Sequence, residues 1–417
     1  MSGNSPAVDA ALKRFEGLYP DTIELSLGRI EHALDALGRP QDRLPPVIHV
    51  AGTNGKGSTC AFMRAMAEAA GLKVHVFTSP HLVRFNERIR LAGKLVEDAA
   101  LIGWLDRTFE AIGGGQITHF EATTAAALLA FSEVPADVLI LEVGLGGKYD
   151  ATNVIGAPAL SVITPVDYDH AQFLGTDLAG IAAEKAGIIK AGRPALTSIQ
   201  QDVADAVITA RAAEVGAPLY RLKPHFIEAM PEEVALSGRH QRANAALAAM
   251  AMQLFGQSVR IDQAAIFKGA REAVWPARMQ RLKDGPVTAL AGGLPVWLDG
   301  GHNPHAARAI ALHLDGLGGK TALVSAMLAS KDSAGFFVPF APLGVEVFTC
   351  PNAPGHQAMP PAELAQAASR AGLRVTACTS FQDAMRAAAA SRPDRLLICG
   401  SLYLAGEVLA MNGEAPE

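Results

Sequence analysis

A glycine-rich turn that contains a lysine is the clearest chemical signal in this chain of 417 residues. The turn follows an apolar run at 47–50 and precedes a helical pattern from Ser58, so it joins a buried strand to a helix. Glycines let backbone N–H groups converge, and the helix N-terminus adds partial positive charge. With the Lys56 ammonium, the turn predicts a phosphate-binding site; a structural turn without a ligand is the alternative. The expected phosphate contacts are Gly52, Thr53, Asn54, Gly55, Lys56, Gly57, Ser58 and Thr59.

The turn departs from the common phosphate-loop pattern in a way that bears on metal binding. That pattern places four residues between its glycines and a Ser or Thr directly after the lysine, where the hydroxyl binds Mg²⁺. Here only Thr53 and Asn54 separate Gly52 from Gly55, and Gly57 follows the lysine. If the turn holds a Mg-nucleotide, the metal ligands must come from elsewhere in the chain.

Polar residues at the ends of three predicted strands are the candidates for that role. Ser79 follows the strand at 73–77, Glu142 lies near the end of the strand at 137–143, and His170 follows the strand at 160–164. The carboxyl ends of parallel strands meet at the ligand-binding edge of an open sheet. On local grounds alone, Ser79 also fits a turn before proline, Glu142 a hydrogen-bonded strand end, and His170 an ordinary histidine.

Alternating strand and helix patterns surround these residues and predict an α/β fold. Glycine and proline interrupt the pattern around 275–295, which suggests a domain boundary. We expect an N-terminal P-loop-type ATPase domain with a mostly parallel sheet at 1–282, and a smaller Rossmann-like α/β domain at 283–417. The first strand of the second domain, at 295–298, is followed by Asp299, His302 and Asn303, again at a ligand-binding edge. The glycine-rich stretch at 144–153 is expected to be a loop without a helix that folds over a ligand.

The composition excludes several classes of protein. Hydrophobic residues make up 50% of the chain and charged residues 18%, which is typical of a well-buried globular protein. The net charge of −5 and the lack of a long basic run argue against a nucleic-acid surface. Four scattered cysteines indicate buried free thiols in a reducing compartment, and no apolar run reaches membrane-spanning length. A cytoplasmic protein is expected.

Taken in order, these segments resemble the folylpolyglutamate synthase and dihydrofolate synthase family, a branch of the Mur ligases. Any one match is weak, but the ordered set spans nearly the whole chain and is specific. The matching stretches are 52–58, 78–82, 86–89, 120–121, 141–147, 150–153, 169–170, 184–188, 299 with 302–304, and 400–403.

The resemblance implies ATP-dependent ligation of a carboxylate to the amine of L-glutamate through an acyl phosphate. The implied acceptor is dihydropteroate, a folate already bearing glutamate, or both, and we favour a bifunctional enzyme. Ser79, Glu142 and His170 would hold the Mg²⁺ that bridges the ATP phosphates. Lys185 matches a lysine that the family carbamylates with CO₂, and the resulting anion would hold a second Mg²⁺. The family pattern also leaves room for a monovalent cation.

The resemblance assigns roles to further residues. Catalytic roles are implied for Lys56, Lys185, Arg278 and His302. Further ATP contacts are implied for Asn244, Arg278 and Asp299. Folate or glutamate contacts are implied for His81, Arg84, Phe120, Asp150, Thr152, His302 and Ser401.

The chain departs from the family pattern at three positions, and two other functions stay open. Lys148 stands where the family usually has arginine, Ala277 stands where glycine is usual, and Gly301 replaces a common alanine. One alternative is another Mur-type amide ligase acting on a cell-wall or storage peptide. The other is a protein that uses ATP only as a conformational switch. Small-molecule substrates, a monomer, and neither nucleic-acid nor membrane partners are expected.

Overall fold

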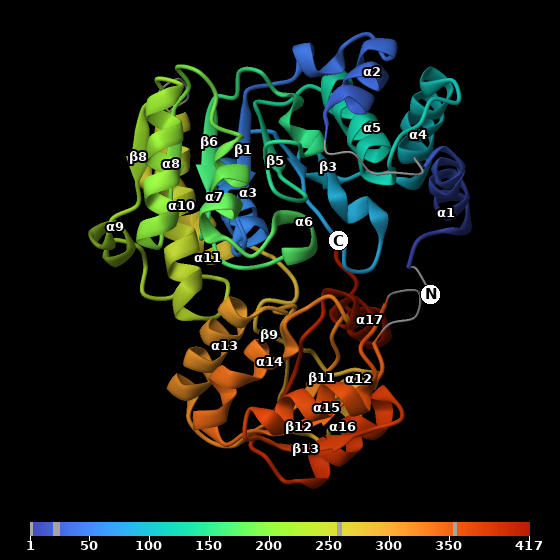
Figure 1. Cartoon of the computed structure of the whole chain (residues 1–417), viewed down its shortest axis with the longest axis vertical. Coiled ribbons are helices and arrows are strands. Elements are labelled where there is room, and N and C mark those ends of the chain that lie inside the picture. The colour runs from blue at the N-terminus through green and yellow to red at the C-terminus, as the bar shows by residue number, and fades with distance from the viewer. Residues whose placement is uncertain (1–2, 20–25, 257–260, 353–356) are drawn as a thin grey trace.

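The chain folds into two α/β units, each built on its own sheet. The computed structural model describes residues 3–19, 26–256, 261–352 and 357–417. The larger unit carries the N-terminal part of the chain, and the C-terminus returns to lie between the two units, beside β3 (Figure 1). The predicted mostly parallel α/β architecture is therefore confirmed.

The larger unit contains an eight-stranded sheet in the order β4-β3-β2-β5-β1-β6-β7-β8. Strands β2, β5, β1, β6, β7 and β8 are parallel, whereas the short hairpin β3–β4 is antiparallel at one edge. Every residue of β1 is buried, as expected for a strand covered on both faces. The strands are β1 Val47–Ala51, β2 Val74–Phe77, β3 Ile89–Leu91, β4 Lys94–Leu95, β5 Val138–Glu142, β6 Leu160–Ile163, β7 Ala195–Thr197 and β8 Leu219–Arg221.

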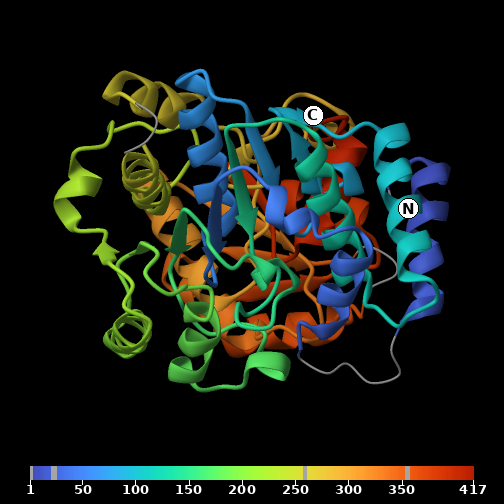
Figure 2. The ribbon, with the colours of Figure 1, turned by 90° about the horizontal axis from the view of Figure 1, so that it is seen from above.

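Helices cover this sheet on both faces (Figure 2). One face packs on α3 (Lys56–Ala69), α10 (Arg239–Phe255) and α11 (Gln263–Glu272) through β1 residues Ile48 and Val50. On the opposite face, two clusters that include Val47 and Ala51 contain the apolar residues of the remaining large helices. Those helices are α1 Pro6–Lys13, α2 Gly28–Ala36, α4 Asp98–Ile112, α5 His119–Glu133, α7 Leu178–Ala186 and α8 Asp202–Glu214; short helices α6 Ala171–Leu174 and α9 Pro224–Glu228 lie in connections.

The smaller unit contains a six-stranded sheet in the order β13-β12-β11-β14-β10-β9. All of its pairings are parallel except that of β9 with β10. Because β9 lies at Gln280–Arg281, the chain enters this sheet just before residue 283, and the boundary itself stays a prediction. The other strands are β10 Val296–Leu298, β11 Thr321–Ser325, β12 Glu346–Thr349, β13 Arg374–Ala377 and β14 Arg395–Cys399. The helices are α12 Pro286–Ala289, α13 Pro304–Leu317, α14 Ser333–Phe337, α15 Pro361–Arg370, α16 Phe381–Ala390 and α17 Leu402–Asn412.

One very close backbone contact joins the two units. Gly406 on α17 packs against Leu82, which follows β2, so tightly that a Cβ at 406 would lie 1.9 Å from the Leu82 carbonyl oxygen. Backbone atoms cannot move aside as a side-chain tip can, so only glycine fits this contact.

The stretch at 144–153 was expected to contain no helix, but the structure forms a short 3₁₀ helix at Ala151–Val154, capped by the Asp150 carboxylate. In the described residues, no helix is both long enough and apolar enough to cross a membrane.

Candidate active site

The predicted phosphate loop lies where β1 ends and α3 begins. Gly52 and Gly55 have φ values of +148° and +83°, in the region that favours glycine. A Cβ at Gly52 would lie 1.9 Å from Thr164 Oγ1, and one at Gly55 would lie 2.7 Å from Asn244 Oδ1. Gly55 is the N-cap of α3 and supplies no side-chain cap, so the first N–H groups of the helix are available to a phosphate.

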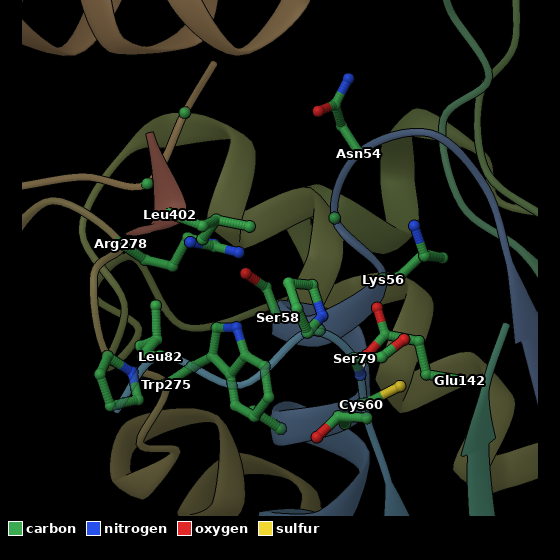
Figure 3. Close-up of a pocket in the computed structure, with 18 of the residues that line it drawn as sticks. Asn54, Lys56, Ser58, Cys60, Ser79, Leu82, Glu142, Trp275, Arg278 and Leu402 are labelled. Carbon is green, nitrogen blue, oxygen red and sulfur yellow. Dashed lines mark hydrogen bonds between the residues drawn. The ribbon is translucent and has the colours of Figure 1, made fainter. Parts of the chain in front are cut away.

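Trp275 explains why a glycine, and not a serine or threonine, follows the lysine of this loop. A Cβ at Gly57 would lie 2.6 Å from the indole ring of Trp275, so the ring packs directly on the helix backbone. A serine or threonine there would displace Trp275. The space that the common pattern gives to a metal-binding hydroxyl is thus filled by an aromatic side chain (Figure 3).

Ser79 and Glu142 meet beside the loop, as the strand-end argument predicted. The Ser79 backbone N–H donates to Glu142 Oε2 at 3.2 Å, and both residues line the same cavity as Lys56 (Figure 3). Glu142 is 4% exposed, and burial raises the pKa of its carboxyl group to about 7 against the opposing charge of Lys56. A buried carboxylate whose negative charge is only partly balanced by its neighbours is suited to binding a cation.

His170 lines the same cavity from the loop after β6 and has a φ of +54°. Burial lowers the pKa of its imidazole to about 4, against the attraction of Asp169. The ring is therefore neutral near pH 7, which is the form that binds metals. Among the described residues, no cluster of three or more His, Cys, Asp and Glu could hold a metal alone. One hydroxyl, one carboxylate and one imidazole fit Mg²⁺ only together with phosphate oxygens and water, as is usual for nucleotide-bound Mg²⁺.

Lys185 lies behind the loop rather than in the cavity. Its Nζ donates to the Gly52 carbonyl oxygen at 3.0 Å, and Lys56 Nζ donates to the same oxygen at 3.2 Å. Burial, followed by repulsion from Lys56, lowers the pKa of the Lys185 amine to about 7. A large share of this amine is therefore uncharged near neutral pH, which is the form that reacts with CO₂.

The loop after β10 in the second unit is held by Asp299. The Asp299 carboxylate accepts from the backbone N–H groups of Gly301 and Met279 at 2.7 and 2.8 Å. The His302 Nδ1 lies 3.0 Å from the Gly300 carbonyl oxygen, which directs Nε2 toward the first unit. Arg278 Nη1 donates to the Ala277 carbonyl oxygen.

Two departures from the family pattern have structural counterparts. Ala277 has a φ of +55°, in the left-handed region, so glycine would adopt this backbone with less strain than alanine. Lys148 Nζ lies 4.9 Å from the centre of the Tyr149 ring. The Lys148 ammonium therefore makes a cation–π contact with Tyr149. A lysine at this position cannot make the forked contact that an arginine could make.

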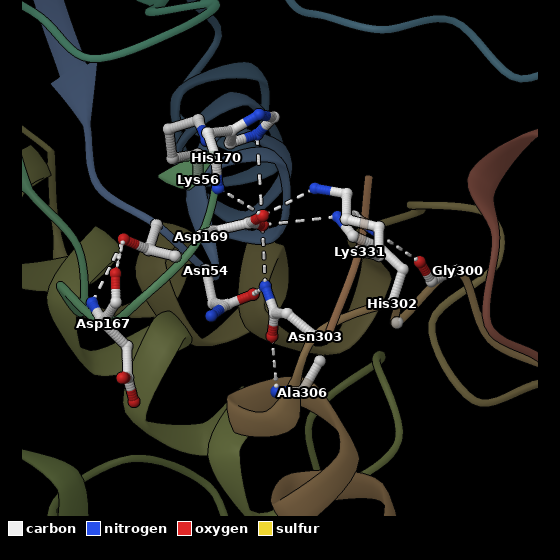
Figure 4. Close-up of polar contacts among 12 residues, drawn as sticks. Asn54, Lys56, Asp167, Asp169, His170, Gly300, His302, Asn303, Ala306 and Lys331 are labelled. Carbon is white, nitrogen blue, oxygen red and sulfur yellow. Dashed lines mark hydrogen bonds and ion pairs between the residues drawn. The ribbon is translucent and has the colours of Figure 1, made fainter. Parts of the chain in front are cut away.

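Asp169 is the centre of a polar network that joins the two units (Figure 4). Its carboxylate accepts from Lys331 Nζ at 2.6 Å and Asn303 Nδ2 at 3.0 Å, and His302 Nε2 lies 3.5 Å away. Asn303 also donates to Asn54 Oδ1 in the phosphate loop at 3.1 Å. Burial alone would raise the pKa of the Asp169 carboxyl, but the His302 hydrogen bond and nearby positive charges hold it well below its usual range.

Lys331 was missed by the sequence reasoning, and so was the contact of Arg308 with Asp167 across the same interface at 2.7 Å. A weak signal was present, because Lys331 lies in the loop after β11, although farther from its strand end than Asp299 lies from the end of β10. Its partner was not predictable, because Asp169 belongs to the other sheet.

Most of the predicted nucleotide residues face one cavity of about 680 Å³ between the two units. The predicted residues that line it are Thr53, Asn54, Gly55, Lys56, Gly57, Ser58, Ser79, Glu142, His170, Asn244, Arg278, Asp299, His302 and Ser401. Those that do not line it are Gly52, Thr59, Lys185, His81, Arg84, Phe120, Asp150 and Thr152.

Asp150 and Thr152 are buried and hydrogen-bonded within the protein. Asp150 accepts from the Leu145 N–H at 2.8 Å and from Thr152 Oγ1 at 2.6 Å, and Thr152 Oγ1 lies 2.9 Å from His49 Nε2. These bonds hold the glycine-rich loop in place. Direct contacts of either residue with a folate therefore stay a prediction.

The other expected folate residues lie at the edge of the first unit. His81 Nδ1 accepts from Arg88 Nε at 2.9 Å, and Arg84 Nη2 donates to the Pro416 carbonyl oxygen at 3.0 Å. The Phe120 ring packs on Gly144, where a Cβ would lie 2.5 Å from the ring. Their contacts with a folate stay predictions as well.

Comparison with known proteins gives consistent matches over nearly the whole chain. Residues 50–221 match the Mur ligase middle domain, and residues 277–402 match the Mur ligase glutamate ligase domain. The chain is 32% identical over 412 residues to the dihydrofolate synthase/folylpolyglutamate synthase of Escherichia coli, covering 95% of this chain and 94% of that one. It is 32% identical over 461 residues to the Mycobacterium tuberculosis protein of the same name, covering 96% and 92%.

Solved structures agree with the sequence comparison. The M. tuberculosis folylpolyglutamate synthase complexed with ADP and AMPPCP superposes with a TM-score of 0.85 at 30% identity, covering 98% of this chain and 100% of that chain. The E. coli FolC in complex with DHPP and ADP gives a TM-score of 0.85 at 31% identity, covering 98% of each chain. The Yersinia pestis enzyme complexed with AMPPNP and a Mn ion gives 0.83 at 31% identity, with the same coverage.

Proposed function

Because the chain belongs to the dihydrofolate synthase/folylpolyglutamate synthase family of Mur ligases, we propose that it ligates L-glutamate to folates at the expense of ATP. The acceptors are dihydropteroate and folates that already bear glutamate. The observation that carries the proposal is the single cavity lined by the phosphate loop, the Ser79–Glu142 pair and the Asp299–His302 loop.

The reaction requires activation, because a carboxylate is a poor electrophile. Its negative charge repels an amine, and oxide is a bad leaving group. Transfer of the ATP γ-phosphoryl group gives an acyl phosphate, from which phosphate leaves when the glutamate amine attacks. The products are an amide, ADP and phosphate.

The phosphate loop supplies most of the charge stabilisation in this proposal. Lys56 and the free N–H groups at the start of α3 hold the phosphates and balance charge on the transferring phosphoryl group. Mg²⁺, when bound, would supply further charge neutralisation. Ser79, Glu142 and His170 are the residues that would hold this ion, and a carbamylated Lys185 would help to hold a second one.

The second unit completes the site and excludes water. Arg278 and Asp299 lie on the cavity wall and Asn244 lies against Gly55, and we assign all three to the nucleotide. His302 and Ser401 also line the cavity, and we assign them to the glutamate. An acyl phosphate hydrolyses in bulk water, so a site closed between two units protects it.

The decisive experiment is a substrate panel that measures ADP release and product mass. The acceptors are dihydropteroate, tetrahydrofolate and a peptidoglycan precursor, each with ATP and L-glutamate. We expect glutamate-dependent ADP release with both folate-type acceptors. Turnover with the peptidoglycan precursor alone would instead indicate a cell-wall ligase, and ADP release without any amide product would indicate a nucleotide switch.

The proposal extends to the wider properties of the protein. We assign the two ligase domains to residues 1–282 and 283–417, although β9 at Gln280–Arg281 already pairs with the second sheet. The enzyme acts as a cytoplasmic monomer on small molecules, which fits its net charge of −5 and its even mixture of charges. The mass of the purified protein, measured by sedimentation, tests whether it is a monomer.

A further inference from the structure

Asn303 lies at the start of α13, directly after the loop that carries Asp299 and His302. It is 3% exposed, and it does not line the cavity between the two units. Its side chain nevertheless makes hydrogen bonds to α13, to the phosphate loop and to the loop after β6 (Figure 4). A residue placed in this way acts on a ligand in the cavity through its neighbours.

The cap of α13 fixes which end of the Asn303 amide faces the first unit. Asn303 Oδ1 accepts from the Ala306 N–H at 2.9 Å and so caps the helix. The NH₂ end faces away from the helix, where it donates to Asn54 Oδ1 at 3.1 Å and to Asp169 Oδ2 at 3.0 Å. Asn54 belongs to the phosphate loop, and Asp169 directly precedes His170. One amide of the second unit therefore holds two loops of the first.

The contact with Asn303 also fixes the orientation of the Asn54 amide. Because Asn54 presents its oxygen to Asn303, its own NH₂ group points elsewhere, and Nδ2 is buried without a hydrogen-bond partner among the described residues. A buried donor without a partner costs about 1–3 kcal/mol. A side chain free of Asn303 would avoid this cost by turning its amide. The orientation of Asn54 in the phosphate loop therefore depends on the docked second unit.

A second contact from α13 reaches the same two loops farther along the helix. Arg308 Nη2 donates to Asp167 Oδ2 at 2.7 Å, and the Asp167 carbonyl oxygen accepts from Thr53 Oγ1 at 2.8 Å. The Thr53 N–H also donates to the Pro165 carbonyl oxygen at 2.9 Å, so the phosphate loop and the loop after β6 are bonded to each other. The Arg308 side chain is 53% exposed, and exposed ion pairs contribute little. The buried Asn303 therefore carries the stronger contact.

We propose that Asn303 is a positioning residue that makes the shape of the phosphate loop and of the His170 loop depend on docking of the second unit. The inference rests on the proposed ligase function. Both loops take their working shape when α13 is in place, so ATP is not committed to phosphoryl transfer while the cavity is open to water. An acyl phosphate then forms only where water is excluded from it.

The test uses two substitutions of Asn303 that keep the cap of α13. Asn303→Ser retains a hydroxyl for the cap but is too short to reach the first unit, and Asn303→Asp retains the size and the capping oxygen but loses both donated bonds. Ser380→Ala is the control, because it removes the N-cap of α16 in the second unit, and Ser380 does not line the cavity.

The first measurement is the rate of ligation of L-glutamate to dihydropteroate. Loss of a hydrogen bond to a charged group corresponds to about a tenfold or greater change. We expect kcat to fall about tenfold or more in both Asn303 variants and to stay unchanged in Ser380→Ala. The KM for ATP should change little, because Asn303 does not line the cavity.

The second measurement is amide hydrogen exchange at residues 52–55 in the free protein, which needs no substrate. We expect exchange there to be about fivefold or more faster in both Asn303 variants than in the wild type, and unchanged in Ser380→Ala. Unfolding midpoints show whether each variant is folded, and Asn303→Asp decides the question if Asn303→Ser is not.

The two measurements separate failure of this inference from failure of the proposed function. An unchanged kcat in the folded variants, or unchanged exchange at 52–55, would overturn the positioning role of Asn303. A wild-type protein that ligates glutamate to no folate-type acceptor, while the exchange difference is present, would instead overturn the proposed function alone.

Discussion

Glu142 gives the most quantitative prediction, because its substitution by glutamine removes one titration and leaves the shape of the site. The carboxyl group is 4% exposed, and burial raises its pKa from 4.5 to about 7. Between these values the folded protein binds more protons than the unfolded chain, so its free energy of unfolding falls as the pH rises. At about 1.4 kcal/mol per pH unit, the loss is at most about 3 kcal/mol across this window.

The assay is unfolding of the wild type and Glu142→Gln without metal at several pH values from 4.5 to 8. We expect the variant to gain stability relative to the wild type as the pH rises, by up to about 3 kcal/mol, with the change complete near pH 7. Adding Mg-ATP should offset most of this difference, since a ligand at 100 times its Kd stabilises the wild type by about 2.7 kcal/mol and the variant binds the ion poorly. A pH-independent difference, or equal stabilisation by Mg-ATP, would refute the reasoning.

Three further predictions concern the lysines of the site. Lys56→Ala should abolish ATP turnover without changing the unfolding midpoint, and retained ligase activity would contradict its role. About half of the Lys185 amine is neutral at pH 7, against about one part in three thousand for an ordinary lysine. We therefore expect ¹³CO₂ to label this amine, and removal of CO₂ to lower the rate of ligation. Absence of the label would contradict the carbamate. Lys331→Ala should lower kcat about tenfold or more, because Asp169 loses an ion-pair partner. In that variant, adding Asp169→Asn should lower kcat little further. Additive losses of kcat would argue against a shared role of the two residues.

The local geometry of the phosphate site could be predicted from the sequence because it depends on contiguous residues. A strand, permissive glycines and a helix start fix the loop, and the shared edge of parallel strands brings Ser79 and Glu142 to it. The need for outside metal ligands followed from Gly57 alone. The reason for that glycine did not, because Trp275 is distant in the sequence.

Contacts between the two units could not be predicted in the same way. The pairing of Asp169 with Lys331 depends on how the two sheets dock, which no periodicity encodes. The inward direction of Asp150 and Thr152 depends on the 3₁₀ helix that replaces the expected open loop. The positive φ of Ala277 likewise became visible only in the backbone.

The contact of Gly406 with Leu82 has a consequence for how far the two halves of the enzyme can approach. Leu82 directly follows the loop that carries Ser79, and α17 starts beside Ser401. The distance between these two parts of the site therefore depends on the missing side chain at Gly406. Any bulkier residue at 406 would hold the two α/β units farther apart, and water could then reach the acyl phosphate.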